Sequence, residues 1–115
     1  MEVTMYGIAN CDTIKKAKKW LEAESVAYQF HDYRKQGIDE ALLRSFVDAL
    51  GWEILLNKRG TTYRQLDEAD KENIDTEKAI SLMLAAPAMI KRPVLKVGEQ
   101  LHVGFKADQY QTLFK

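Results

Sequence analysis

The chain contains a single cysteine, Cys11, and its position is the clearest indication of chemistry in the sequence. Cys11 follows an apolar run, Val3 to Ile8, and precedes a segment with helical spacing. A helix N-terminus presents unpaired N–H groups and the positive end of the helix dipole, and both favour a negative charge. Because the thiolate is the nucleophilic form of cysteine, Cys11 is predicted to be a reactive thiol.

The surroundings of Cys11 bear on this prediction, because a lone cysteine is more often a small buried hydrophobic residue. Its neighbours Asn10 and Asp12 are polar, and open α/β sheets bind ligands where a strand ends and a helix begins. Lys15, one helical turn on, would add positive field. Asp12 would raise the pKa of the thiol unless it caps the helix. We expect a net pKa below the usual value for a thiol.

The composition excludes several classes of protein. The 115 residues fit one domain, with 46% hydrophobic and 30% charged residues and a formal net charge of zero, so no strongly basic surface for nucleic acid or anionic membranes is indicated. No apolar run approaches the ~20 residues of a membrane span, and the first residues lack the features of a signal peptide. One cysteine cannot form an internal disulfide, which favours a reducing compartment, the cytosol. His31 and His102 have no ligand partners at metal spacing, so a metal site is not expected.

The first third of the chain is predicted to form a strand, a helix and a strand. The opening run, residues 3–8, is typical of a short buried strand. Asp12 and Thr13 are candidate N-cap residues for the helix that follows. The apolar residues of this helix recur near helical spacing, at Ile14, Ala17, Trp20 and Leu21. Lysines occupy most of its other positions. Alternating apolar residues over 26–31 then indicate a half-buried second strand.

The middle of the chain is predicted to be a helical insert over about residues 35–87. Asp39 is expected to cap one helix that stops at Gly51, and Asp75 or Thr76 to cap another that ends before Pro87. The apolar stretch 52–56 fits either a helix or a strand. Residues 63–66 are expected to form a helical turn.

The last third is predicted to be a hairpin followed by a short helix. Strands over 93–97 and 101–105 are joined through residues 98–100, and a helix covers about 107–114. The predicted fold is therefore α/β, a four-stranded mixed sheet with an inserted helical subdomain. A single domain spans 1–115, in which about 1–34 and 88–115 form the part that contains the sheet.

Several ordered motifs resemble the ArsC/Spx family, and more closely its YffB branch. The resemblance covers nearly the whole chain. It is carried by residues 6–17 around Cys11, His31-Asp32-Tyr33-Arg34, Gly51-Trp52, residues 55–63, Ile90-Lys91-Arg92-Pro93 and Val103-Gly104-Phe105. It implies a thioredoxin-like fold with a helical insertion, Cys11 as the nucleophile, Pro93 as a cis-proline opposite it, and Arg92 as an anion contact.

Departures from the family pattern concern the residues that handle arsenate. The arsenate reductases of the family have a histidine at the position of Gly7 and an arginine at that of Lys15. Of their three arginines for the oxyanion only Arg92 keeps its match; the other positions are Asn57 and Val103, although Arg59 lies close enough in sequence to substitute. Lysine and asparagine do not reproduce bidentate guanidinium recognition, so efficient arsenate reduction is not expected.

The function predicted from these observations is that of a cytosolic monothiol reductase. The Cys11 thiolate would form a mixed disulfide, and an external thiol, glutathione or a glutaredoxin, would release it because the chain has no resolving cysteine. No bound cofactor is expected, and glutathione is the expected co-substrate. The predicted thiol-substrate site comprises Asn10, Thr13, Ile14, Lys15, Arg59, Arg92 and Pro93.

Other interpretations stay open at this point. The first is a glutaredoxin-coupled arsenate reductase. The second is a non-enzymatic, Spx-like regulator that binds transcription machinery through the insert and Gly51-Trp52. An intramolecular disulfide switch is excluded, because Cys11-Asp12-Thr13-Ile14 lacks the second cysteine of a C-x-x-C motif. The Lys15-Lys16 and Lys18-Lys19 pairs are usual for a solvated helix face, or could attract an anionic thiol such as glutathione.

Overall fold

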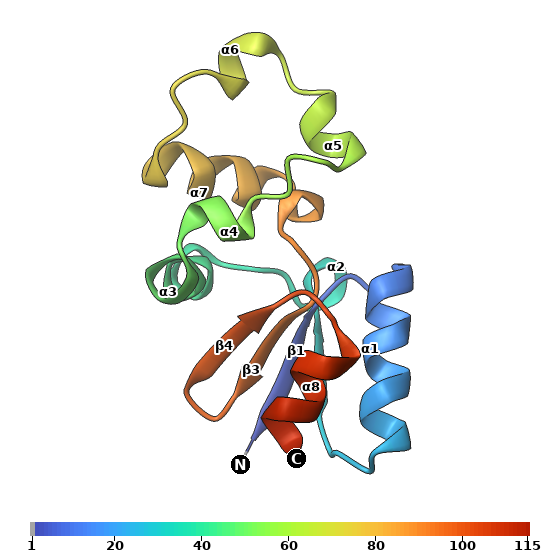
Figure 1. The fold of residues 1–115 in the computed structure, drawn as a ribbon. Coiled ribbons are helices and arrows are strands. Elements are labelled where there is room, and N and C mark those ends of the chain that lie inside the picture. Colours follow the sequence, from blue (N-terminus) through green and yellow to red (C-terminus); the bar gives the residue numbers. More distant parts are fainter. Residues whose placement is uncertain (1) are drawn as a thin grey trace. The chain divides into compact units, whose positions relative to one another are not determined.

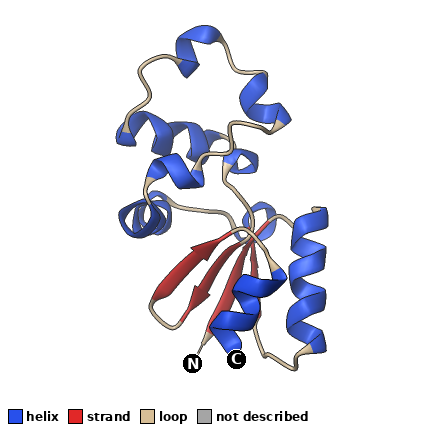
Figure 2. Cartoon of the chain, in the orientation of Figure 1, coloured by secondary structure: helices blue, strands red, loops and turns tan. Residues whose placement is uncertain are grey.

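The computed structural model describes residues 2–115, and these divide into two compact units (Figure 1). The first unit comprises residues up to Gln36 together with Arg92–Lys115, and the second comprises Gly37–Lys91. These bounds lie a few residues from those expected from the sequence. Figure 2 shows that all four strands of the sheet lie in the first unit, and that helices and loops make up the second.

The sheet of the first unit is mixed and four-stranded, as predicted, and its strand order is β2-β1-β3-β4. Strand β1 (Val3–Gly7) pairs in parallel with β2 (Gln29–Asp32) and antiparallel with β3 (Val94–Val97), and β3 pairs antiparallel with β4 (Gln100–Val103). The two-residue turn between β3 and β4 contains Gly98, whose φ of +60° suits glycine. Strand β1 is thus central, and its carboxyl end lies beside that of β2.

Two helices cover one face of this sheet. Helix α1 (Asp12–Ala23) joins β1 to β2, and α8 (Ala107–Phe114) follows the hairpin (Figure 1). Their apolar faces share one core with alternate residues of β1 and β3: Val3, Met5, Ile14, Ala17, Leu21, Leu95, Val97 and Tyr110. Ring contacts of Trp20 with Tyr110 and Phe114 bring the two helices together. The core therefore fixes the start of α1 against the end of β1.

The second unit is built around α3 (Glu40–Leu50) and α7 (Thr76–Ala85). The other elements are α4 (Trp52–Leu55), α5 (Thr61–Arg64), α6 (Glu68–Lys71) and the 3₁₀ helix η1 (Pro87–Met89). Leu56 and Ile90 form an isolated antiparallel bridge. Arg44 on α3 holds Glu77 on α7 through two hydrogen bonds, of 2.8 and 2.6 Å, and the same arginine lowers the pKa of Glu77. The helical insert predicted from sequence is a folded unit with buried apolar residues of its own.

Several element boundaries differ from those expected. The second strand begins at Gln29 rather than near Val26, because Glu24 and Ser25 still hydrogen-bond back to α1 and Ser25 adopts a positive φ of +57°. The ambiguous stretch 52–56 is a helix that ends at Leu55. Helix α2 (Tyr33–Gln36) and α6 were not predicted, and each is only one turn long. Asp39 and Asp75 cap α3 and α7 as expected, and Gly51 ends α3 with φ +87°.

Candidate functional site

Cys11 lies between β1 and α1, as predicted, and it is half-buried. Its backbone is extended, with φ −145° and ψ 131°, and its carbonyl oxygen accepts the first helical hydrogen bond, from the Lys15 N–H at 3.0 Å. Cys11 is therefore itself the N-cap residue of α1. The expectation that Asp12 or Thr13 would fill this role is wrong, because the helix begins at Asp12 and so already includes both residues.

The thiol lies next to the unpaired N–H groups at the start of α1. The neutral thiol, a weak acceptor, makes no cap hydrogen bond with any described residue. The pKa of Cys11 is nonetheless below its usual value. Partial burial raises it, but backbone hydrogen bonding from Ile14 and Thr13 to the sulfur, followed by the positive charge and a hydrogen bond of Arg92, outweighs burial. The site thus stabilises the thiolate over the thiol, which is the condition for a nucleophile at neutral pH.

Arg92 reaches this site from the end of the chain segment that leads into β3. Gly7 at the end of β1 lies between Ile14 and Arg92: a Cβ placed on Gly7 would meet Ile14 Cδ1 at 2.5 Å and Arg92 Cβ at 3.8 Å. No side chain fits at position 7 without moving Ile14. The Arg92–Pro93 peptide bond is cis, as the resemblance implied, and the buried Pro93 carbonyl accepts a hydrogen bond from the Gly104 N–H at 2.9 Å.

Tyr33 is a neighbour of the site that was not predicted from the sequence. Tyr33 follows β2, is 3% exposed, and its hydroxyl has no hydrogen-bond partner among residues 2–115. Burial and the nearby Tyr6 raise its pKa while Arg92 lowers it, so the phenol lies in the electrostatic range of the same arginine. The available signal was topological: parallel strands place their carboxyl ends together, so the residue after β2 had to lie near the residues after β1.

The other residues predicted for the site differ in where the structure places them. Asn10 is exposed immediately before Cys11, and Lys15 is exposed on the first turn of α1. Arg92, and not Lys15, is the cation that lowers the pKa of the thiol. Arg59 belongs to the second unit, where its N–H donates to Asn57 Oδ1 at 3.1 Å. There it lines a cavity of about 350 Å³ with Glu53, Leu56, Asn57, Lys58 and Lys91. Its membership of the Cys11 site stays a prediction.

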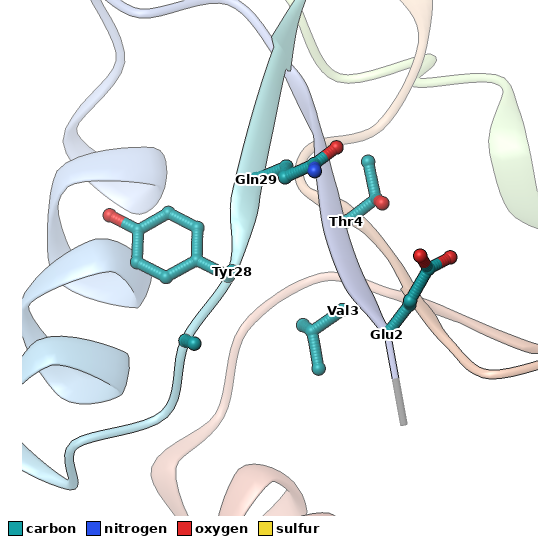
Figure 3. A pocket seen from close by; sticks show the side chains of 6 residues that line it. Glu2, Val3, Thr4, Tyr28 and Gln29 are labelled. Atoms are coloured by element: carbon teal, nitrogen blue, oxygen red, sulfur yellow. The ribbon is translucent and has the colours of Figure 1, made fainter.

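Other candidate sites are poorer. Over residues 2–115 no three His, Cys, Asp or Glu side chains are grouped as a metal would require, and His31 and His102 are residues of β2 and β4. A cavity of about 260 Å³ lies among Glu2, Val3, Thr4, Ala27, Tyr28 and Gln29 (Figure 3). This cavity is at the amino end of β1, whereas Cys11 follows its carboxyl end. Among the described residues no helix has the length and apolarity needed to cross a membrane.

The arrangement around Cys11 can carry out one kind of chemistry. A stabilised thiolate can attack an electrophilic sulfur, and the guanidinium beside it can hold an anionic group of the partner. The chain offers no second thiol, since Cys11 is its one cysteine. Any catalytic cycle must therefore take a second thiol from outside the chain.

Comparisons with known proteins agree with this reading of the fold. Residues 6–113 match the model of the ArsC family. The solved structure of the YffB protein is 52% identical, with a TM-score of 0.95, and the alignment covers 98% of this chain and 99% of that one. An arsenate reductase (ArsC) related protein from Brucella melitensis is also 52% identical, with a TM-score of 0.82, and the alignment covers 100% and 96% of the two chains.

Curated relatives of the chain include an uncharacterized protein and a transcriptional regulator. An uncharacterized protein from Haemophilus influenzae is 42% identical, over 97% of this chain and 98% of its own. The global transcriptional regulator Spx of Streptococcus mutans is 25% identical, over 96% of this chain and 81% of its own. The similarity to these proteins extends along the whole chain and so includes both units.

Proposed function

The chain belongs to the ArsC family, and from this premise we propose that it is a monothiol thiol–disulfide reductase of the cytosol that works with glutathione or a glutaredoxin. The coarser description, a thiol oxidoreductase fold of the arsenate reductase type with one cysteine, is given by its relatives and its sequence. One observation carries the finer proposal. The only thiol of the chain caps α1, and two helix N–H groups and Arg92 lower its pKa.

The proposed cycle has two exchange steps. The Cys11 thiolate attacks one sulfur of a substrate disulfide R–S–S–R′; a Cys11–S–S–R bond forms, the R–S–S–R′ bond breaks, and R′ leaves as a thiolate. A second, external thiolate then attacks the R sulfur of this mixed disulfide. It becomes the new partner of R, supplies the electrons that reduced R′, and releases the Cys11 thiolate.

Each neighbouring residue has a role in this scheme. The N–H groups of Thr13 and Ile14 stabilise the thiolate both before attack and when it is the leaving group. Arg92 holds an anionic part of the bound thiol, such as a glutathione carboxylate. Asn10, Lys15 and Pro93, which belong to the same unit as Cys11, complete the proposed thiol-substrate site.

Incubation with oxidised glutathione, followed by intact-mass measurement, tests the proposal. We expect one glutathione adduct per chain in the wild type and none in Cys11→Ser. Alkylation rates measured against pH should give a thiol pKa below the ordinary value, and should fall several-fold at neutral pH in Arg92→Gln. A wild-type protein that forms no adduct, or a thiol of ordinary or raised pKa, would refute the proposal.

Arsenate reduction is the second candidate, favoured by the contact between Arg92 and the thiol. Two of the three arginine positions implied by the family resemblance are filled by Asn57 and Val103, and Val103 is a residue of β4 paired with Val94. Neither side chain can take part in a bidentate contact with an oxyanion. A glutaredoxin-coupled assay at high arsenate decides this point, since absence of turnover eliminates the candidate.

A regulatory role is the third candidate, favoured by the similarity to Spx. Helix α4 carries the most exposed large apolar side chain of the described residues, Ile54 at 48%, beside Trp52. Such a surface could contact a component of the transcription machinery. A pull-down with purified RNA polymerase that retains no polymerase subunit would remove this candidate.

A further inference from the structure

The outward face of α1 carries three lysines, Lys15, Lys16 and Lys19, which we call the lysine face. All three are exposed, and their helical positions lie opposite the buried Ile14 and Ala17. Lys18 lies at the margin of this face, with its ammonium 3.7 Å from the centroid of the Phe30 ring. A shallow depression of about 510 Å³ runs along the face, lined by Asp12, Lys15, Lys16, Lys18, Lys19 and Glu22.

The charges of the lysine face contribute nothing evident to the stability of the fold. Among residues 2–115, none of Lys15, Lys16 and Lys19 takes part in an ion pair, whereas Lys115 at the far end of the chain pairs with Glu24 at 2.6 Å. Cations on the first turns of a helix are opposed by its dipole, and Lys15 and Lys19 are like charges four residues apart. A surface that breaks these local preferences without a compensating contact is a candidate for function.

The lysine face begins beside the reactive thiol. Lys15 is on the first turn, where its N–H donates to the Cys11 carbonyl oxygen, and Lys19 follows one turn later. Lys19 is eight residues after Cys11, which is about 12 Å along the helix axis. A charged surface of this length is suited to contact with another protein. Glutathione offers only two carboxylates, and Arg92 together with the first turn of α1 already provides cations for them.

We propose that the lysine face is the docking surface for a protein thiol partner whose surface beside its reactive cysteine is acidic. This inference rests on the proposed function, and it names the kind of partner that exchanges with Cys11. The lysines attract the acidic surface before contact, and orient it so that its cysteine meets the sulfur at the start of α1. Glutathione remains able to react, but gains little from the distal lysines.

Two cysteine-containing peptides can serve as probes for such a surface. Each has an N-terminal cysteine and two glycines, followed by four glutamates in one peptide and four glutamines in the other. Cys11 is first converted to its mixed disulfide with 5-thio-2-nitrobenzoate. Each thiol attacks the Cys11 sulfur, forms a new mixed disulfide with it and releases the coloured thiolate, so absorbance gives the exchange rate. Glutathione is the third thiol in the series.

The test compares the wild type with Lys16→Gln/Lys19→Gln, which leaves Cys11, Lys15 and Arg92 in place. Glutamine keeps a helix propensity close to that of lysine, so the helix should persist. The matched control is Lys35→Gln/Lys106→Gln, which makes the same change in net charge at exposed positions on α2 and before α8. A circular dichroism spectrum checks that each variant is folded.

We expect the glutamate peptide to react roughly tenfold faster than the glutamine peptide at about 20 mM salt, with the ratio falling towards one at about 500 mM. In Lys16→Gln/Lys19→Gln the low-salt ratio should fall to about twofold, while the glutathione rate is unchanged. The control variant should retain most of the wild-type ratio.

Three results would overturn the inference. If the ratio of the glutamate-peptide rate to the glutamine-peptide rate is the same in the wild type and in Lys16→Gln/Lys19→Gln, the lysine face does not attract an acidic partner. An equal loss in the control variant assigns the effect to net charge. A glutathione rate that falls as much as the glutamate-peptide rate assigns the face to glutathione. Slow exchange with all three thiols is a distinct result, because it refutes the proposed function itself.

Discussion

The helices α1 and α3 begin in different ways, and the difference separates reactivity from stability. Asp39 caps α3, and its carboxylate accepts the Leu42 N–H at 2.8 Å; Asp75 caps α7 in the same way, through the Lys78 N–H at 2.8 Å. At the start of α1 the cap is Cys11, which makes no such bond as a neutral thiol to any described residue. The α1 N–H groups are therefore available to a thiolate.

The start of α1 is held by packing in place of a cap. Ile14 is fully buried, and it lies so close to Gly7 that position 7 has no room for a side chain. The same packing presents the Ile14 N–H to the sulfur. A helix start can thus be stabilised by a polar cap or by buried contacts, and only the second arrangement leaves its N–H groups to a reactive side chain.

Replacing Cys11 with aspartate converts the α1 start into one of the α3 type, and should have the largest effect. We expect disulfide exchange to fall to background, because the chain then has no thiol. Unfolding in urea should show a gain of about 1 kcal/mol, since aspartate is a good N-cap. Cys11→Ser, which also lacks the thiol, is measured beside it as a second variant. A Cys11→Asp protein less stable than the wild type would contradict the view that the α1 start lacks an effective cap.

Filling position 7 tests the packing that replaces the cap. Gly7→Ala puts a methyl group 2.5 Å from Ile14 Cδ1, and we expect a loss of about 1–3 kcal/mol in the free energy of unfolding. Ile14→Val removes the Cδ1 atom with which the new methyl group would clash. The double variant should therefore lose less than the sum of the two single variants, and strict additivity in urea unfolding would count against a direct contact.

Removing each cap tests the comparison from the other side. Asp39→Ala and Asp75→Ala should each cost about 1 kcal/mol, because each leaves a helix N–H without its carboxylate. Neither change should alter the alkylation rate of Cys11. Cys11→Ala, measured below the pKa of the thiol, should cost clearly less than either. Equal losses in all three variants would mean that the neutral thiol caps α1 as well as aspartate does.

The pH dependence of stability should also distinguish the helix start at Cys11 from the aspartate-capped starts. The expected effect is smaller than those of the substitutions above. The pKa of Cys11 is lower in the folded chain than in the unfolded one, so the folded state loses its proton first. Stability relative to Cys11→Ser should therefore rise with pH from the folded pKa up to the ordinary thiol value, and the gain should disappear as pH falls through the folded pKa. A difference that stays constant over this range would show that the N–H groups and Arg92 do not favour the thiolate.

Sequence alone predicted the elements whose signals are local. The polar caps Asp39 and Asp75, the stop at Gly51 and the hairpin turn at Gly98 each depend on a few adjacent residues, and each was found as expected. The resemblance to a family supplied the cis bond before Pro93, which no local pattern indicates.

Features that depend on tertiary packing were predicted less well. The cap of α1 is Cys11, although Asp12 and Thr13 are better capping residues, and the first turn is packed through Ile14, which lies beside Gly7. The strand at Gln29 starts late, because Glu24 and Ser25, which follow α1, still hydrogen-bond back to the helix. Tyr33 joins the neighbourhood of Arg92 through strand pairing, which brings together residues distant in sequence. Such positions could be inferred only with the sheet topology in hand.

The sheet register has a consequence for the order in which this protein matures. Strand β1 lies between β2, which follows it closely in sequence, and β3, whose Val97 pairs with Val3 from nearly the other end of the chain. During translation, Cys11 and α1 emerge early, whereas Arg92 and β3 emerge only after the whole second unit has been made. The N–H groups of Thr13 and Ile14, which lower the pKa of the thiol most, lie close to Cys11 in sequence, whereas the further lowering by Arg92 waits for the long-range pairing of β1 with β3.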